Sequence, residues 1–257
     1  MQARDPAQIM NRIDEKLQTI AAGNGVKRTY VLVHGAWHGG WVWRDVIVGL
    51  RAMGHRVTAP TLTGLGERRH TAQDTADLEI HIEDIVAHIE MEDLQNVALV
   101  GWSYGGMVTT GVSARIPDKI KSMIYLDAYV PENGKALIDY VSSDVREMYD
   151  AHKDANIPVP PLSFKAFGLN DQAIIDFVKP RLTSQPWRTL YQPVKTLTPR
   201  PNIPITYICC TGWPTPFTSF LEGMKKDPKV ATEVINTNHY PMLAAPMETI
   251  DILINGA

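Results

Sequence analysis

The stretch "VALVGWSYGGMV", residues 97–108, constrains this chain more than any other part of its sequence. Four apolar residues lead into a Gly-x-Ser-x-Gly pentapeptide centred on Ser103. Between a buried strand and a helix, this pentapeptide holds its serine on a strained turn where only small neighbours avoid collisions. A serine hydroxyl presented there can attack a substrate if an adjacent base activates it. We therefore predict that Ser103 is a nucleophile; the alternative is a serine in an ordinary turn of small residues.

Around this motif, apolar runs alternate with stretches of helical pattern. The runs "RTYVLV", "HRVTAP", "NVALV", "KSMIYL", "PITYICC" and "KVATEVI" read as strands, and residues 41–53, 76–92, 104–116 and 246–256 read as helices. Such alternation predicts a parallel sheet with helices on its faces. Because the runs are continuously apolar, both faces of the sheet should be buried. We predict an α/β class with a mostly parallel central sheet and helices on both faces.

The alternation stops over residues 131–201. This proline-rich segment, which contains "NIPVPPLSF" and "LTPRPNIP", has no clear strand pattern. We predict that it is a helical cap inserted into a core formed by residues 28–130 and 202–257. Residues 1–27 have apolar positions at helical spacing and are predicted to form an N-terminal helical extension.

Composition narrows the function classes. The chain has 257 residues, 44% of them hydrophobic, and a formal net charge of −3 without basic blocks. A core of normal size is expected, whereas a nucleic-acid surface is not. Neither a secretory apolar segment nor a run long enough to span a bilayer is visible, so we expect a soluble protein that does not bind membranes. The only cysteines, Cys209 and Cys210, are adjacent in an apolar run and are expected to be free core thiols of a cytoplasmic protein. A homodimer formed through the N-terminal segment is left open.

A second motif, "VLVHGAWHGGW", follows the first strand. An oxyanion hole in this architecture takes one backbone N–H from the residue after the nucleophile and one from a loop after an earlier strand. Tyr104 and Ala36 occupy those places. We predict that their amides form the oxyanion hole, the alternative for the second motif being a plain glycine-rich turn.

Eight histidines are candidates for the base. His239, in "VINTNHYPMLAAP", follows the last strand and precedes the last helix, where the chain order of nucleophile, acid and base places it. His34 and His38 flank the residues that supply the Ala36 amide, a segment that we call the oxyanion loop, and are expected to support it. His55, His81 and His88 fall within strand or helix patterns and are expected to be structural.

The acid is harder to find. The usual carboxylate follows the strand before the last one, but residues 211–220 contain neither Asp nor Glu. Asp127 directly follows the apolar run that comes next after the nucleophile, and a carboxylate at the end of a buried strand is costly without a partner. We predict Asp127 as the acid, with Glu222 and Asp227 as alternatives.

From about residue 28 onward, these motifs resemble the α/β-hydrolase superfamily, and within it the branch of small esterases and hydroxynitrile lyases. The stretches "HGAWHGGW", "PTLTGLGER" and "YLDAYVPENG" are similar to a bacterial set of hydrolases in that superfamily. The resemblance also implies the acidic role for Asp127. It departs at Trp102, where the family usually has His, and Gly35 and Tyr240 stand where the lyases carry a hydroxyl residue and a lysine.

We expect a serine hydrolase that cleaves a small apolar or aromatic carboxylic ester through an acyl-enzyme, without a metal or cofactor. Its partner would be a small-molecule substrate. An amide, carbamate or lactone hydrolase with the same triad is the nearest alternative, and a ligand-binding receptor or a cofactor-free oxygenase would be more distant ones. The residues expected to line the substrate pocket are Trp37, Trp102, Tyr129, Tyr240 and Met242.

Overall fold

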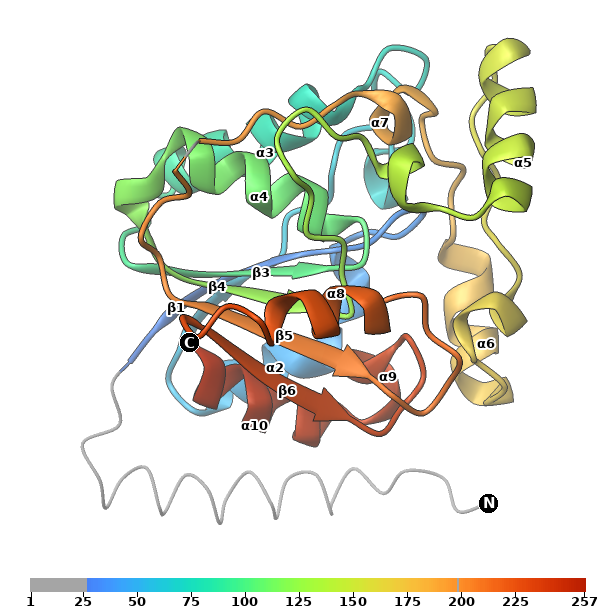
Figure 1. The fold of residues 1–257 in the computed structure, drawn as a ribbon. Helices are drawn as coiled ribbons and strands as arrows, with labels where there is room; N and C mark the ends of the chain where they lie inside the picture. Colours follow the sequence, from blue (N-terminus) through green and yellow to red (C-terminus); the bar gives the residue numbers. More distant parts are fainter. Residues whose placement is uncertain (1–26, 198) are drawn as a thin grey trace.

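A computed structural model describes residues 27–197 and 199–257 of the chain. Its centre is a six-stranded sheet in the order β2-β1-β3-β4-β5-β6, and every neighbouring pair is parallel (Figure 1). The strands are β1 (Thr29–Val33), β2 (Arg56–Thr58), β3 (Val97–Trp102), β4 (Ile120–Leu126), β5 (Ile205–Cys210) and β6 (Val230–Ile235). The predicted α/β class with a parallel central sheet is confirmed.

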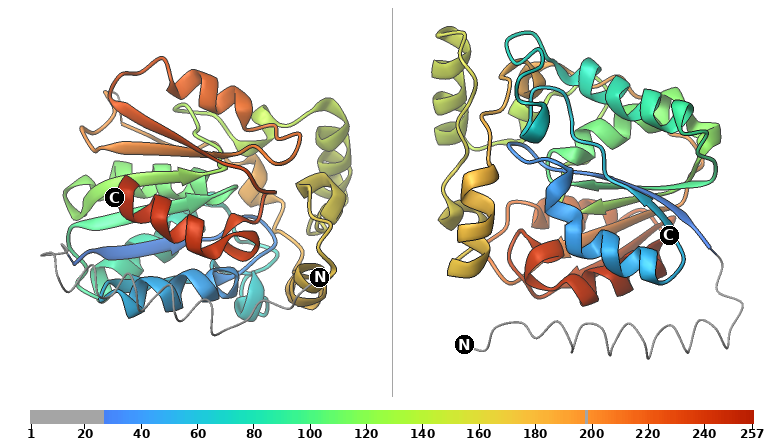
Figure 2. Two further views of the ribbon diagram at one scale, coloured as in Figure 1. Left: turned by 90° about the horizontal axis from the view of Figure 1, so that it is seen from below. Right: turned by 180° about the vertical axis from the view of Figure 1, so that it is seen from behind.

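Helices cover both faces of this sheet (Figures 1 and 2). Helices α3 (Leu78–Met91) and α4 (Gly105–Arg115) lie on one face, and α2 (Arg44–Ala52) and α10 (Pro246–Gly256) lie on the other. Helix α3 begins where the Asp77 carboxylate caps it by accepting a hydrogen bond from the N–H of Ile80 at 2.9 Å. Such a cap satisfies a backbone donor that the helix itself leaves unpaired.

The continuous apolar runs form the interior strands. Strands β3 and β5 are buried along their whole length, whereas β6, at the edge, is exposed or partly buried except at its last residue, Ile235. The register pairs Val33 with Gly101 and Trp102 with Leu126. The carboxyl ends of β1, β3 and β4 therefore meet at one edge of the sheet, so the loops that follow them are neighbours.

The segment between β4 and β5 lies beyond this edge. It contains α5 (Ser143–Asp154), α6 (Gln172–Val178) and α7 (Arg188–Tyr191), and Figure 1 shows α5 and α6 standing beyond the strand arrowheads. A single antiparallel bridge joins Val159 to Gln185. We call this segment the cap; its predicted limits, and the division of the chain that they imply, stay a prediction. Two short helices, α8 (Thr218–Met224) and α9 (Pro241–Ala244), follow β5 and β6.

The predicted N-terminal helix falls almost entirely on residues 1–26, which lie outside the described residues. None of the helices within residues 27–197 and 199–257 combines the length and the apolar character that crossing a bilayer would require.

Candidate active site

Ser103 lies on a tight turn between β3 and α4, as the pentapeptide predicts. Its backbone has φ of 56°, in the left-handed region that costs a non-glycine residue about 1–3 kcal/mol. Three hydrogen bonds hold it there: its N–H donates to the carbonyl of Leu126 at 3.3 Å, and its carbonyl accepts from the N–H groups of Gly106 at 3.1 Å and Tyr129 at 3.2 Å. The turn therefore depends on β4 and on the loop that follows it.

Glycines let other backbone segments approach this turn. A Cβ atom on Gly106 would lie 2.0 Å from the carbonyl oxygen of Tyr129. A Cβ atom on Gly35, in the oxyanion loop, would lie 2.9 Å from the Cβ of Ser103. Any larger residue at position 35 would push this loop away from the nucleophile.

Asp127 follows β4 directly and is fully buried. Its φ of 44° is also left-handed. The Oδ1 atom accepts hydrogen bonds from the N–H of Cys210 at 3.1 Å and the hydroxyl of Thr215 at 3.4 Å, and the Oδ2 atom lies 2.7 Å from Nδ1 of His239. These partners satisfy a carboxylate that would otherwise be costly to bury.

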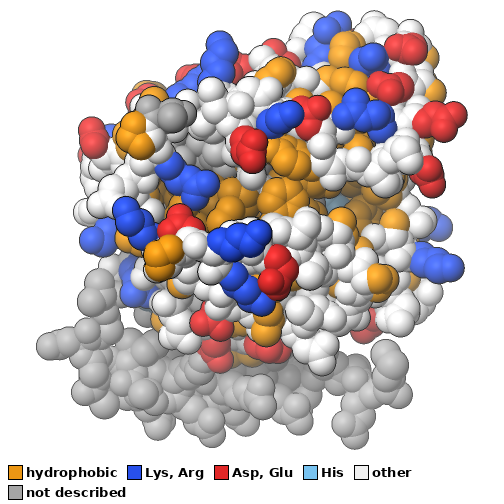
Figure 3. All heavy atoms as spheres, viewed as in Figure 1, with side chains coloured by type: hydrophobic (Ala, Val, Ile, Leu, Met, Phe, Trp, Pro, Cys, Tyr) orange, Lys and Arg blue, Asp and Glu red, His pale blue; other side chains and the backbone are white. Residues whose placement is uncertain are grey.

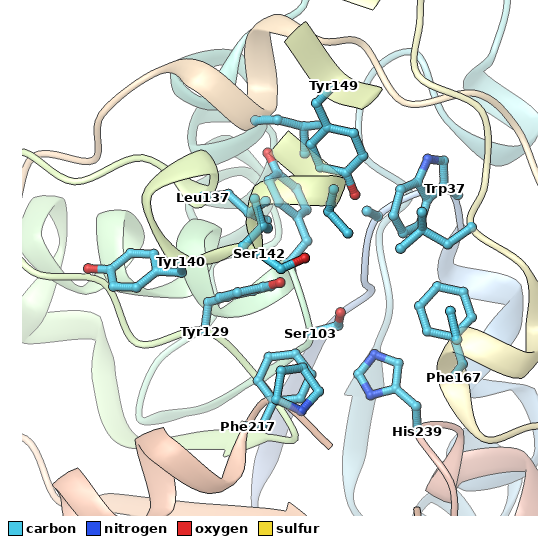
Figure 4. Close-up of a pocket in the computed structure, with 18 of the residues that line it drawn as sticks. Trp37, Ser103, Tyr129, Leu137, Tyr140, Ser142, Tyr149, Phe167, Phe217 and His239 are labelled. Atoms are coloured by element: carbon cyan, nitrogen blue, oxygen red, sulfur yellow. The ribbon is translucent and has the colours of Figure 1, made fainter. Parts of the chain in front are cut away.

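This carboxylate fixes the tautomer of the His239 imidazole. Since an ionised carboxylate only accepts hydrogen bonds, Nδ1 of His239 carries the proton and Nε2 is free to act as a base. Figure 4 shows the imidazole facing the Ser103 hydroxyl at the base of the pocket. The structure thus brings together Ser103, His239 and Asp127 from the ends of three different strands.

Two phenylalanine rings hold the imidazole of His239 between them. Phe167 from the cap stacks on one side at 5.4 Å and 16°, and Phe217, from the loop after β5, stacks on the other at 5.3 Å and 10°. The backbone of His239 is also fixed, because its N–H donates to the carbonyl of Phe167 at 3.1 Å. Aromatic faces are favourable neighbours for the cation that forms when the base takes a proton.

Trp102 contributes in a different way from the one the sequence suggested. It is 1% exposed and lies beneath the pocket, and its indole Nε1–H donates to the carbonyl of His239 at 2.8 Å. Tyr240 and Met242 are also fully buried. None of these three side chains lines the cavity, so the expectation that they do is corrected: they pack in the core, and Trp102 supports the backbone of the base.

The two alternative carboxylates lie on the surface. Glu222, in α8, pairs with Lys225 at 2.8 Å, and Asp227 accepts a hydrogen bond from the N–H of Lys229 at 3.0 Å. Both are solvated charges, so Asp127 is the carboxylate that contacts His239.

Two backbone N–H groups are available beside Ser103. Ala36 and Tyr104 both line the pocket, and no acceptor among the described residues takes a hydrogen bond from either amide. The Gly35 carbonyl accepts from Nδ1 of His34 at 2.8 Å and from the N–H of His38 at 3.4 Å. In a trans peptide the carbonyl and the N–H point in opposite directions, so this anchoring leaves the Ala36 N–H free to face the pocket.

Buried histidines hold these loops in their neutral form. Burial lowers the pKa of both His34 and His38 to about 3. His34 accepts from the N–H of Leu62 through Nε2 at 3.0 Å, so the proton is on Nδ1. Neutral imidazoles suit this place because a charge there would be buried without a carboxylate.

A third buried histidine, His81, holds the side chain of Tyr104. Its hydroxyl lies 2.9 Å from Nδ1 of His81, whose Nε2 donates to the carbonyl of Thr63 at 2.8 Å. Burial lowers the pKa of His81 to about 4, so the ring is neutral and Nδ1 accepts from Tyr104. The predicted structural role of His81 thus includes holding the residue that follows the nucleophile.

The pocket above these groups has a volume of about 210 Å³. Trp37 and Tyr129 line it as expected, but most of its wall comes from residues that the sequence did not indicate. These are Leu137, Tyr140, Val141, Ser142, Val145, Tyr149, Leu162, Ala166, Leu190, Trp213, Pro216 and Phe217; Phe167, an aromatic residue of the cap, completes this part of the wall. For those that lie in the cap, the spacing along the sequence carries no signal of which side chains face inward.

This pocket contains no Lys, Arg, Asp or Glu side chain. Figure 3 shows hydrophobic side chains across the middle of one face, with charged side chains distributed around them. Within the described part of the chain, no three His, Cys, Asp or Glu side chains are grouped as a metal site would need.

Comparisons with known proteins agree with this geometry. The model of the alpha/beta hydrolase family matches residues 30–252. A carbendazim hydrolyzing esterase from Nocardioides sp. (strain SG-4G) is 57% identical over 109 residues, 42% of this chain and 45% of that protein. Methylesterase 10 from Arabidopsis thaliana is 35% identical over 105 residues, 40% of this chain and 38% of that protein. The chain thus matches less than half the length of these two relatives.

A solved structure shares the fold along nearly its whole length. It is an extracellular alpha/beta-hydrolase from a Paenibacillus species, with a TM-score of 0.76 and 22% identity over 90% of this chain and 99% of that one. The sheet order, the serine turn after β3 and the family match agree, and they confirm the predicted superfamily. The chain belongs to the alpha/beta hydrolase family.

Proposed function

We propose that the protein is a serine hydrolase that cleaves small, neutral, aromatic carboxylic esters. The observation that carries this proposal is the Asp127–His239 hydrogen bond of 2.7 Å beside a serine held in a left-handed turn. The esterase names of the matched relatives support the same chemistry.

The chemistry follows from the positions of the groups. Nε2 of His239 takes the proton of Ser103 as its oxygen attacks the ester carbonyl, and the resulting imidazolium remains hydrogen-bonded to Asp127. The amides of Ala36 and Tyr104 donate to the developing oxyanion. His239 then gives its proton to the leaving alcohol, and a water molecule activated by the same imidazole hydrolyses the acyl-enzyme.

The pocket selects for neutral substrates. Its small volume, about 210 Å³, lies below the range of about 300–1,000 Å³ that is usual for drug-sized ligands. Because no charged side chain lines it, a charged substituent would lose its hydration without gaining a partner.

Hydroxyl groups in the pocket favour a carbamate as a second candidate substrate. Tyr129, Ser142 and Tyr149 line the cavity, and no described residue forms a hydrogen bond with their hydroxyls (Figure 4). Burial raises the pKa of Tyr129 and of Tyr149, so both remain neutral donors at physiological pH. A carbamate on a heteroaromatic ring offers them several acceptors, and the match with a carbendazim hydrolyzing esterase makes carbendazim the carbamate to test.

A substrate panel tests the proposal. We expect hydrolysis of p-nitrophenyl acetate, methyl benzoate and carbendazim, none of it by Ser103→Ala. Against methyl benzoate, the matched monoanion of monomethyl terephthalate should be at least about 100-fold poorer in kcat/KM, because its carboxylate is buried unpaired. Absence of hydrolysis across the panel would refute the proposed function, and equal rates for the matched pair would refute the selection for neutral substrates.

We also propose a cytoplasmic location. Cys209 and Cys210 are both buried and free, which fits a reducing compartment. Fractionation of cells that express the full chain tests this; recovery in the culture medium or the periplasm would contradict it.

A further inference from the structure

Among the described residues, the hydrogen bonds between the cap and the oxyanion loop all involve Trp37. The N–H of Trp37 donates to Oε1 of Gln185 at 2.9 Å, and its carbonyl accepts from the N–H of Thr183 at 3.0 Å. Its indole Nε1–H donates to the carbonyl of Val159 at 3.0 Å. Trp37 needs such support because its φ of 66° lies in the left-handed region, where a bulky residue is strained.

These contacts fix the peptide plane between Ala36 and Trp37. On one side of the plane, Nδ1 of His38 donates to the Ala36 carbonyl at 2.6 Å; on the other side, the Trp37 N–H donates to Gln185. A peptide unit is rigid, so holding both of its polar groups fixes ψ of Ala36. The preceding plane, which carries the Ala36 N–H, is held by His34 through the Gly35 carbonyl. The direction of the Ala36 N–H is therefore determined from both sides.

Gln185 is itself held firmly. It is 0% exposed, its backbone exchanges two hydrogen bonds of 2.8 Å with Val159, and its Nε2 donates to the Thr189 hydroxyl at 2.6 Å. The Thr189 hydroxyl also interacts with the phenol of Tyr104, where it opposes the rise in pKa caused by burial. One buried polar pair in the cap therefore contacts Trp37, which follows Ala36 in the oxyanion loop, and Tyr104.

We propose that Gln185 is a positioning residue for the oxyanion hole. It acts through the Ala36–Trp37 peptide and makes the docked cap a condition for the hole to be formed. This inference rests on the proposed ester hydrolysis. It assigns to the cap a catalytic task in addition to enclosing the substrate.

The test variant is Gln185→Met, which keeps the length of the side chain and removes its acceptor. Loss of an oxyanion donor costs roughly 10²–10³ in rate, so a misdirected donor should lower kcat about 10- to 100-fold. KM should stay within about twofold of the wild-type value, because the pocket wall is unchanged.

A ratio of substrates separates positioning from a general structural effect. The hole stabilises an oxygen anion better than the larger, weaker acceptor formed from a thionoester. We therefore expect Gln185→Met to lower the ratio of kcat/KM for an aryl ester to that for its thionoester analogue. The ratio is independent of the fraction of folded enzyme, so partial misfolding does not change it. Gln185→Asn, too short to reach Trp37, serves the same purpose if the methionine variant does not fold.

Two variants serve as controls. Tyr191→Phe removes a hydrogen bond of 2.7 Å to Asp150 within the cap, away from the pocket, and should keep the wild-type ratio. Gln185→Glu keeps an acceptor oxygen for the Trp37 N–H but loses the donor to Thr189, and should restore part of the ratio. A wild-type ratio in Gln185→Met, or an equal fall in Tyr191→Phe, would overturn the inference alone. An inactive wild-type enzyme would instead refute the proposed function.

Discussion

Asp127 shows how one residue can replace a feature that is missing elsewhere. The loop after β5 has no carboxylate, but it supplies Thr215, whose hydroxyl binds Asp127, and Phe217, whose ring stacks on His239. Asp127 reaches the same imidazole from the end of β4 because its left-handed φ of 44° turns the chain there. The acid has moved by one strand while the contact with the base is kept.

At this scale, Asp127→Asn should lower kcat by about 10²–10⁴-fold. The amide of Asn can donate to Nδ1 of His239, and this stabilises the tautomer whose Nε2 carries the proton and cannot act as the base. The thermal midpoint should change little, since Asn fills the same space. Rates of p-nitrophenyl acetate hydrolysis, with circular dichroism for folding, measure this. The matched control is Glu222→Gln, which should retain the wild-type rate because Glu222 lies on the surface, away from His239, and pairs with Lys225. A mild loss in Asp127→Asn would contradict the account.

The residues that sequence reasoning found differ in kind from those that it missed. Ser103 and Ala36 lie in local motifs, and the glycines beside them in the sequence indicate the backbone geometry. Gln185 carries no such signal, because its role arises only when the cap docks on the oxyanion loop. For the same reason the sequence did not indicate that Trp102 donates to the carbonyl of His239, 137 residues away.

At the scale of elements, continuous apolar runs predicted the six strands of the sheet, and helical patterns predicted the four helices on its faces, with small shifts at their ends. The cap helices were predicted only as a class, since their amphipathic faces do not specify which loops they cover. One of the tightest fits between elements lies where α4 meets the loop after β4. There the backbone of Gly106 packs against the carbonyl of Tyr129.

Gly106→Ala should therefore destabilise the protein by about 1–3 kcal/mol or more, because its Cβ would overlap a backbone atom that cannot move aside without shifting the serine turn. Denaturant unfolding and the rate of ester hydrolysis should both show the loss. The control is Gly223→Ala in α8, where the added Cβ would have no described atom within 4 Å outside the backbone of its own helix and its chain neighbours, so the change should be neutral or slightly stabilising. Similar stability for the two variants would contradict the packing described for α4.

At the scale of the whole molecule, three buried neutral histidines around the site should make the free energy of unfolding depend on pH. His34, His38 and His81 are held with pKa values of about 3, about 3 and about 4, against an unfolded value of about 6.5. Below about pH 6.5 the unfolded chain binds these protons and the native state does not. The free energy of unfolding should therefore rise with pH between about 4 and 6.5, by up to about 1.4 kcal/mol per pH unit for each group.

Urea unfolding at about pH 5 and about pH 7.5 measures this slope, and the midpoint should be clearly lower at the acidic pH. His81→Gln removes roughly one of the protons taken up on unfolding. The slope of the free energy of unfolding against pH should therefore fall by up to about 1.4 kcal/mol per pH unit, whatever the effect of the variant on stability at neutral pH. An unchanged slope in this variant would show that His81 is protonated in the native state.

The central claim is that Ser103 is the nucleophile, and covalent labelling tests it most directly. The protein should be incubated with a fluorophosphonate and the adduct located by peptide mass spectrometry. We expect one adduct, on Ser103, whose formation parallels the loss of ester hydrolysis and which is absent from Ser103→Ala. An adduct on another residue, or ester hydrolysis that persists in Ser103→Ala, would contradict the account.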